Sequence, residues 1–332
     1  MPLRSVLVLH NQPILPADHP DAESEHTVID VAEGIAQALR KAGYEATLLG
    51  VGADPMALWQ YLQERKPDVV FNLYEGLADD PETESFITGL LDWSGIPYTG
   101  SSVTTLTLAR NKHLTKYLLK GAGLPTADFV VVESLPAPRW NGAFPVMVKP
   151  AAQDGSVGVS QESVCTTHEE AEARVRFVLE QYGPPVLIER YIDGREFNVA
   201  VMELPELKGL PPLEIGFREI QAKWPILTYS GKWKPESAEY RTTPVQHPAE
   251  LPETHARNLQ HLAEQAYRLL GCRDYARVDF RMTSAGEAYI LEINPNPELS
   301  ETAGFCSCLG STPYSYDEFI ALLARHAYTR TK

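Results

Sequence analysis

The chain has 332 residues, of which 44% are hydrophobic and 22% charged, and its formal net charge is -15. This length exceeds what one hydrophobic core usually serves, so we expect two or three units of ~100–150 residues each. The excess of acidic residues argues against a nucleic-acid partner, because neutralising phosphates requires a surplus of Lys and Arg. No apolar run approaches the ~18 residues of a membrane span, so we expect no membrane partner.

Residues 1–100 alternate strand and helix patterns, which is typical of a parallel α/β unit. We expect strands at 5–9, 45–49 and 68–73 and helices at 25–42, 55–65 and 82–93. In the first helix, Val28, Val31, Ile35 and Leu39 recur at steps of three and four residues, so one face should pack on the sheet. The segment GIPYTGSS predicts a connector, and we place the first boundary at residue 100.

Residues 101–183 form the second predicted unit and residues 184–332 the third. Two helical stretches between 103 and 123 precede a β-rich block with strands at 129–132, 145–149, 157–160, 186–191 and 197–202 and a helix at 169–181. Further strands are expected at 213–220, 276–282 and 287–293, and helices at 249–270 and 317–327. Short strands joined by turns favour antiparallel α+β units.

Four cysteines in a chain of this size are typical of reduced thiols rather than a disulfide framework, so we expect a cytoplasmic protein. The N-terminal segment contains a short apolar run without the small-residue pattern of a secretory cleavage site. Cys306 and Cys308 form a C-x-C pair that lacks a second Cys/His pair. Two thiols on a loop are therefore favoured over a zinc site.

The segment YARVDFRMTSAGEAYILEINPN carries the strongest chemical signal. Alternate residues of a strand share a face, which groups Glu292 with Asn294 and, on the preceding strand, Arg277 with Asp279. Ser-Ala-Gly between the two strands predicts a hairpin. If the polar faces coincide, Asp279, Glu292 and Asn294 converge as oxygen ligands that suit Mg²⁺ rather than zinc. A solvated sheet face is the alternative.

FPVMVKPAAQDGSVGVS predicts a strand that ends at Lys149, followed by a glycine-rich loop that contains Gly155, Ser156 and Val157. Glycine lets backbone N–H groups approach anionic oxygens, and the Lys149 ammonium adds positive charge, so the segment suits phosphate binding. A glycine-rich hairpin without a ligand is the alternative. No G-x-x-x-x-G-K-[ST] motif occurs, which disfavours a P-loop NTPase.

Taken in order, Lys112, Lys149 with its loop, IERYIDGREFNV, and RVDF with LEINPNP resemble the ATP-grasp fold of D-alanine–D-alanine ligases, from about Val70 to Pro297. The resemblance implies an N-terminal parallel α/β domain before two ATP-grasp subdomains. It also implies an ATP-dependent ligase that forms ADP and an acyl-phosphate and joins a carboxylate to an amine. ATP and Mg²⁺ are the implied cofactors, with Mn²⁺ as the alternative metal. Amino acids or similar small molecules are the implied substrates, and relatives are often homodimers.

The resemblance also implies roles for the charged residues. Lys112 and Lys149 are expected to contact the ATP phosphates, Lys223 to lie near the transferred phosphate, and Arg277 to stabilise the developing oxyanion and acyl-phosphate. The predicted oxygen ligands would hold the metal ion that bridges the phosphates.

For the nucleoside, the strand that contains Glu189, Arg190 and Ile192 should offer backbone groups and the Glu189 carboxylate to adenine. Glu196 resembles the carboxylate that accepts hydrogen bonds from the ribose. A charged surface edge is the alternative for Glu189, Arg190 and Glu196.

Departures from the family pattern fall where its members bind their substrates. Glu75 replaces the usual His, Gly155 aligns with a serine, Trp224 with a tyrosine and Glu298 with a glycine. We therefore hypothesise that Glu75, Glu298 and Glu301 favour a substrate with an additional amino or guanidino group, the alternative being acids that point to solvent. A genuine D-alanine–D-alanine ligase of peptidoglycan synthesis and an inactive ATP-binding sensor or partner protein stay as further alternatives.

Overall fold

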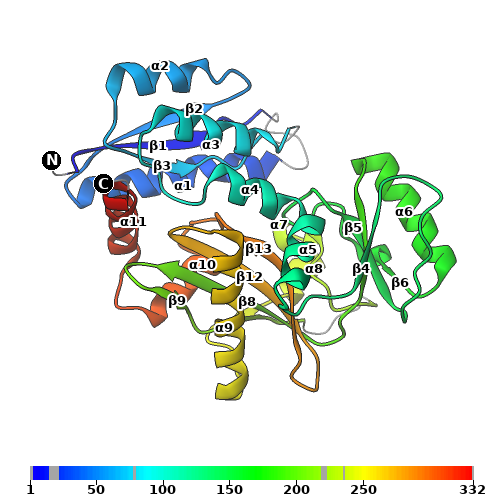
Figure 1. Ribbon diagram of the computed structural model, residues 1–332. Coiled ribbons are helices and arrows are strands. Elements are labelled where there is room, and N and C mark those ends of the chain that lie inside the picture. The colour runs from blue at the N-terminus through cyan, green and yellow to red at the C-terminus, as the bar shows by residue number, and fades with distance from the viewer. Residues whose placement is uncertain (1–2, 15–21, 78–79, 218–222, 235, 331–332) are drawn as a thin grey trace.

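The computed structural model describes residues 3–14, 22–77, 80–217, 223–234 and 236–330, without the side chains of residues 22–26. Its N-terminal part is a parallel sheet with strand order β2-β1-β3, which confirms the predicted α/β unit (Figure 1). The elements are β1 (Ser5–Asn11), α1 (Ala22–Lys41), β2 (Glu45–Val51), α2 (Met56–Arg65), β3 (Val69–Leu73) and α3 (Thr83–Ser94). Because β1 and β3 are parallel, their carboxyl ends place Asn11 and Glu75 at one edge of the sheet.

The next part is an antiparallel sheet of order β4-β7-β5-β6 covered on one face by α6 (Figure 1). Its elements are α4 (Val103–Arg110), α5 (Lys112–Gly121), β4 (Phe129–Val132), β5 (Val146–Pro150), the 3₁₀ helix η1 (Gln161–Ser163), β6 (Val164–Cys165), α6 (His168–Tyr182) and β7 (Val186–Arg190). The predicted boundary at residue 183 falls inside this sheet, because β7 pairs with both β4 and β5. The chain passes from this sheet to the next one between Arg190 and Arg195.

A strand expected at residues 157–160 is replaced by turns that lead into η1. Gly155, Ser156 and Gly158 have φ angles of 62°, 64° and 72°. These left-handed conformations are incompatible with a pleated strand. The glycine-rich segment therefore forms a compact loop.

The largest sheet has strand order β11-β10-β8-β12-β13, with β9 added beside β8, and α9 packs on it (Figure 1). The elements are β8 (Arg195–Glu203), β9 (Leu207–Gly209), β10 (Leu213–Ile215), α7 (Tyr229–Trp233), α8 (Ala238–Thr242), β11 (Val245–Gln246), α9 (Glu253–Leu270), β12 (Tyr275–Met282), β13 (Ala288–Asn294), α10 (Gly304–Ser307), η2 (Cys308–Ser311) and α11 (Tyr316–Arg330). The strand expected at 213–220 ends at Ile215, and residues 218–222 lie outside the described part.

The last helix returns to the first part of the chain. Phe319 and Leu323 of α11 are buried in one core with Ile35 and Leu39 of α1, and the two helices lie side by side (Figure 1). Arg330 also forms an ion pair with the buried Asp274, which accepts a hydrogen bond of 2.7 Å from the Gly100 amide. These contacts tie the N-terminal sheet to the C-terminal sheet.

All four cysteines lie in the described part, are buried, and are free thiols. Burial, together with nearby carboxylates, raises the pKa of Cys306 to about 12, and burial does the same for Cys308. Both belong to the core shared with α1. Within the described ranges, no helix combines the length and apolar character needed to cross a bilayer.

Candidate active site

A cavity of about 1780 Å³ lies where the three sheets meet. Most of the residues singled out in the sequence line it, namely Glu75, Lys112, Lys149, Gly155, Ser156, Val157, Glu189, Arg190, Ile192, Glu196, Arg277, Asp279, Glu292, Asn294 and Glu298. Small-molecule sites commonly measure ~300–1,000 Å³, so this volume has room for more than one ligand. Lys223 and Trp224 are not among the described lining residues.

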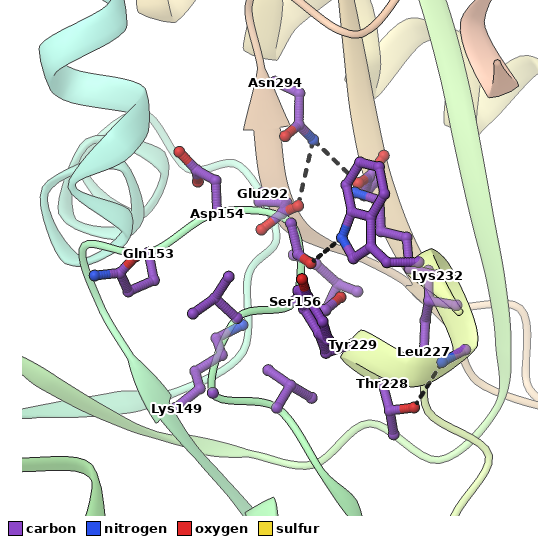
Figure 2. A pocket seen from close by; sticks show the side chains of 18 of the residues that line it. Lys149, Gln153, Asp154, Ser156, Leu227, Thr228, Tyr229, Lys232, Glu292 and Asn294 are labelled. Atoms are coloured by element: carbon purple, nitrogen blue, oxygen red, sulfur yellow. Dashed lines mark hydrogen bonds between the residues drawn. The ribbon is translucent and has the colours of Figure 1, made fainter. Parts of the chain in front are cut away.

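The predicted hairpin is present, and its register sets Asp279 opposite Glu292 and Arg277 opposite Asn294. The Asn294 amide donates to Asp279 Oδ2 at 3.0 Å and to Glu292 Oε1 at 3.4 Å, so it lies between the two carboxylates (Figure 2). Arg277 donates to both Asp279 oxygens, at 2.8 and 2.9 Å. The three predicted oxygen ligands therefore converge, as strand periodicity predicted.

Opposite electrostatic influences act on the two carboxylates. Burial alone would raise the pKa of Glu292, but Lys112, Lys149 and Arg277 hold it well below its usual range. Burial raises the pKa of Asp279 in spite of Arg277, and the facing Glu292 adds to the rise. The two adjacent carboxylates repel each other, so an additional cation bound between them would be favourable.

Buried lysines line the side of the cavity formed by α5 and β5. Lys112 Nζ lies 2.7 Å from Asp154 Oδ1 and 3.4 Å from Glu292 Oε2. Glu189, 3% exposed, forms ion pairs with Lys149 at 2.6 Å and with Lys116 at 2.7 Å. Although burial opposes it, this double contact lowers the pKa of Glu189 to about 2. We call Lys112, Lys149 and Glu189, together with Lys116, which pairs with Glu189 but does not line the cavity, the lysine end of the cavity.

Lys116 was not identified from the sequence. It is 1% exposed and donates a hydrogen bond of 2.8 Å to Thr126, whose hydroxyl donates in turn to the Ile290 carbonyl of β13. Its position four residues after Lys112 places it on the same face of α5. The four-residue spacing from Lys112 could have identified Lys116, but lysines at this spacing are also typical of a solvent-exposed helix face.

Lys223 and Trp224 lie elsewhere than expected. Lys223 is exposed, with its ammonium 5.5 Å from the centroid of the Trp224 ring, and Trp224 packs against Tyr191 in a separate apolar cluster. Lys232 of α7 lines the cavity instead (Figure 2). Burial and the charge of Arg277 lower the pKa of Lys232.

The sequence contains two Lys-Trp pairs, and the second is the one at the cavity. Trp233 Nε1 donates a hydrogen bond of 2.9 Å to the carbonyl of Gly155, so α7 is joined to the glycine-rich loop. Gly155 has a φ of 62°, and a Cβ there would meet the Trp233 ring at 3.4 Å. The left-handed φ, rather than a lack of space beside Trp233, is therefore what favours glycine at this position.

Glu196 and its neighbours form the wall next to the lysine end. Glu196 is buried and forms an ion pair of 2.9 Å with Arg281. Arg190 lies with its guanidinium 4.8 Å from the centroid of the Tyr289 ring. Ile192, which lies between Arg190 and Glu196 in the sequence, is buried and adds an apolar side chain to the cavity lining. The alternative of a charged surface edge does not describe Glu189 or Glu196, because both are buried.

Acidic residues also line the cavity where the chain leaves β3 and, later, β13. Glu75 is exposed to the cavity space, and partial loss of hydration together with the charges of Glu298 and Glu84 raises its pKa to about 7. Glu298 accepts a hydrogen bond of 2.6 Å from Ser300. Glu84 forms an ion pair with Arg110, whereas Glu301 is exposed and not a lining residue. We call Glu75 and Glu298 the acidic end of the cavity.

The two β-rich sheets, which follow an N-terminal parallel sheet, have the fold of the ATP-grasp class of ligases. Residues 118–324 match the family model described as the D-ala D-ala ligase C-terminus. A D-alanine–D-alanine ligase of Geobacter sulfurreducens is 34% identical over 278 residues, covering 82% of this chain and 80% of that protein. An uncharacterized protein of Sinorhizobium fredii, y4sG, is 31% identical over 305 residues, covering 87% and 85%.

The fold agrees with these matches. A D-alanine–D-alanine ligase from Bacillus anthracis, solved in complex with ATP, superposes with a TM-score of 0.74 at 20% identity over 98% of both chains. The chain belongs to the D-alanine–D-alanine ligase family. It is therefore an ATP-dependent, ADP-forming ligase that joins a carboxylate to an amine.

Proposed function

We propose that this ligase activates the carboxylate of an amino acid, or of a similar small molecule, and couples it to the amine of a second such molecule. The observation that carries the proposal is the convergence of Asp279, Glu292 and Asn294 in one cavity with Lys112 and Lys149. Carboxylates are acceptors for cations, and lysines bind phosphate oxygens. The arrangement supports binding of a metal–triphosphate complex between the sheets.

The donor set fits Mg²⁺, with Mn²⁺ as the alternative. Within the described ranges, no three His, Cys, Asp or Glu side chains form a metal site by themselves, so the set consists of two carboxylates and one amide. Mg²⁺ characteristically takes one or two protein carboxylates and completes its shell with phosphate oxygens and water. Bound there, it would neutralise charge on the phosphates during transfer.

In the proposed reaction, an oxygen of the substrate carboxylate attacks the γ-phosphorus of ATP, the bond to the β–γ bridging oxygen breaks, and ADP leaves. A neutral amine then attacks the carbonyl carbon of the acyl-phosphate, phosphate leaves, and the nitrogen loses a proton. Lys112 and Lys149 bind phosphate oxygens, and Arg277 opposes the developing oxyanion. Lys232 takes the place near the transferred phosphate that the sequence had assigned to Lys223.

The nucleoside is proposed to lie along β7 and the start of β8. Glu189 and the backbone up to Ile192 face the adenine, and Glu196 faces the ribose hydroxyls. All three line the same cavity as Lys149, which supports this placement. Arg190, held against Tyr289, closes the wall beside them.

The experiment is ADP release measured with D-alanine and with a panel of other amino acids, in the presence of Mg²⁺ or Mn²⁺. ADP formation that requires the amino acids and the metal supports the proposal. Release of AMP and pyrophosphate instead would indicate adenylate chemistry and contradict it. Tight ATP binding without turnover under all conditions would indicate the sensor alternative. The paired Asp279→Asn and Glu292→Gln variants should abolish the metal dependence together with turnover.

D-alanine as both substrates is the second candidate, and the relatives named D-alanine–D-alanine ligase favour it. If D-alanine gave the highest kcat/KM in the panel, the acidic end would not select a different substrate. We also propose a cytoplasmic location, supported by four free thiols. The homodimer stays a prediction that light scattering of the purified protein would test.

A further inference from the structure

Three protein oxygens surround the ammonium group of Lys112, which has three N–H donors. Its nitrogen lies 2.5 Å from the carbonyl oxygen of Gln153, 2.7 Å from Asp154 Oδ1 and 3.4 Å from Glu292 Oε2. The protein therefore supplies one acceptor for each donor. A phosphate oxygen can bond to Lys112 only in exchange for one of these three oxygens.

Asp154 is the acceptor that can leave Lys112 most easily. Gln153 offers a backbone carbonyl, which moves only with the chain, and Glu292 belongs to the hairpin of β12 and β13. The Asp154 side chain is 43% exposed and can rotate. It also has a second cation within reach, because its Oδ2 lies 3.3 Å from Arg110 Nη1.

Arg110, at the end of α4, is able to hold this carboxylate. Its side chain is 10% exposed and is fixed by an ion pair between Nη2 and the buried Glu84 of α3. The guanidinium has five donors, and its Nε is buried with no hydrogen-bond partner among the described residues. Arg110 therefore has the capacity to strengthen its contact with Asp154 without releasing Glu84.

We infer that Asp154 competes with a phosphate group of ATP for Lys112, and that Arg110 is the positioning residue that holds Asp154 when the phosphate binds. This inference rests on the proposed function, in which Lys112 contacts the phosphates. The exchange leaves every charge paired, with the phosphate on Lys112 and the carboxylate on Arg110. Asp154 thus weakens nucleotide binding, and its return to Lys112 assists the release of ADP.

The place of Asp154 in the chain explains why a second cation is needed. Asp154 directly precedes Gly155 of the glycine-rich loop and lines the same cavity as Lys149 and Glu292 (Figure 2). A carboxylate this close to bound phosphates repels them, and the repulsion is strong where water is excluded. The positive charge of Arg110 offsets it, because Arg110 approaches Asp154 from the side of α3 and α4.

The test is the Kd for ATP in the presence of Mg²⁺, measured by isothermal titration calorimetry for the wild type and Asp154→Asn. This variant keeps the shape of the side chain and removes its charge. We expect Kd to fall ~3–10-fold, because a half-exposed ion pair no longer has to be broken. The Kd for adenosine, which has no phosphate, should stay within about twofold. A residue that only supports the fold would not tighten ATP binding when it is changed.

Asp128→Asn is the matched control. Asp128 Oδ1 lies 2.8 Å from Lys120 Nζ, so the same kind of ion pair is broken, but neither residue lines the cavity. The Kd for ATP should stay at its wild-type value. Thermal unfolding of each variant separates an effect on binding from an effect on folding.

The role of Arg110 is tested in a Glu84→Gln background, so that the variant leaves no unpaired acid on α3. In that background Arg110→Met should raise the Kd for ATP ~3–10-fold, because Asp154 then has only Lys112 as a partner. Adding Asp154→Asn should reduce the effect of Arg110→Met to less than about twofold. If the Arg110 variants do not fold, the result for Asp154→Asn decides the competition alone.

Each outcome has a defined meaning. An unchanged Kd for ATP in Asp154→Asn overturns the competition, and a raised Kd shows that Asp154 anchors the loop and overturns it as well. An equal gain for adenosine places the effect at the nucleoside and contradicts the inference. An Arg110→Met effect that persists with Asp154→Asn means that Arg110 itself contacts ATP. In all these cases ATP still binds and the ligase function stands, whereas a wild-type protein that binds no ATP overturns the proposed function.

Discussion

The two ends of the cavity differ in how their charged groups are paired. At the lysine end every ionised group has a partner, as in the pairs of Glu189 with Lys116 and Lys149. At the acidic end Glu75 and Glu298 repel each other, and no cation of the described residues forms an ion pair with either, although Lys232 and Arg110 act on Glu75 from farther away. Paired charges hold each other in place, whereas an exposed carboxylate without a partner is stabilised by water and stays free to change partners. The lysine end is therefore preorganised by its own ion pairs, and the acidic end is not.

The largest effect should come from breaking the pairing at the lysine end. Lys116→Met leaves the Glu189 carboxylate with only Lys149, and we expect the free energy of unfolding to fall by about 3–5 kcal/mol. Urea denaturation followed by tryptophan fluorescence measures it. Arg257→Met is the control, since its pair with Glu253 is exposed on α9 and should contribute almost nothing. Equal effects of the two variants would contradict the buried network.

Lys116→Met has a second readout, in function. Because Lys116 orients Glu189 and reaches β13 through Thr126, KM for ATP should rise more than kcat falls. A purely structural residue would lower the melting temperature and leave KM for ATP unchanged.

The next effect compares the two Lys-Trp pairs. Lys232→Met should lower kcat by ~10²–10³-fold, because it removes a cation positioned next to developing charge in a cavity screened from water. Lys223→Met removes the same group from an exposed position and should leave kcat within about twofold, since surface charges away from the site contribute little. Steady-state ADP release measures both. A large decrease in kcat for Lys223→Met would instead support Lys223 as the lysine near the transferred phosphate, as the sequence predicted.

The hairpin of β12 and β13 was predictable because its information is local. A strand repeat of two residues and a Ser-Ala-Gly turn fix which side chains share a face, so the convergence of Asp279, Glu292 and Asn294 could be predicted. Lys149 and the loop around Gly155 were predictable for the same reason. The parallel order of β1, β2 and β3 also follows from the alternation of strands and helices.

Other features depend on contacts that leave no local pattern. The packing of α11 on α1 joins segments at opposite ends of the chain, and nothing in either segment specifies its partner. Two Lys-Trp pairs stand nine residues apart in the printed sequence. They differ in their tertiary contacts, because Trp224 packs on Tyr191 whereas Trp233 donates a hydrogen bond to Gly155. Lys116 has the spacing of an ordinary helix-surface lysine, and tertiary burial alone reveals its role.

The smallest effect concerns the pH dependence of stability at the acidic end. The folded protein raises the pKa of Glu75 from 4.5 to about 7, through burial, Glu298 and Glu84. Between these values the folded state binds more protons than the unfolded state, so stability should fall as pH rises through this window. Glu75→Gln should flatten the slope measured by urea denaturation at a series of pH values.

The slope will not vanish in Glu75→Gln, because burial also raises the pKa of Glu84 to about 7 in spite of Arg110. Glu301→Gln removes an exposed acid and should keep the wild-type slope. If the slope is unchanged in Glu75→Gln, the acids at this end are too well solvated to repel each other, and the contrast between the two ends would not hold.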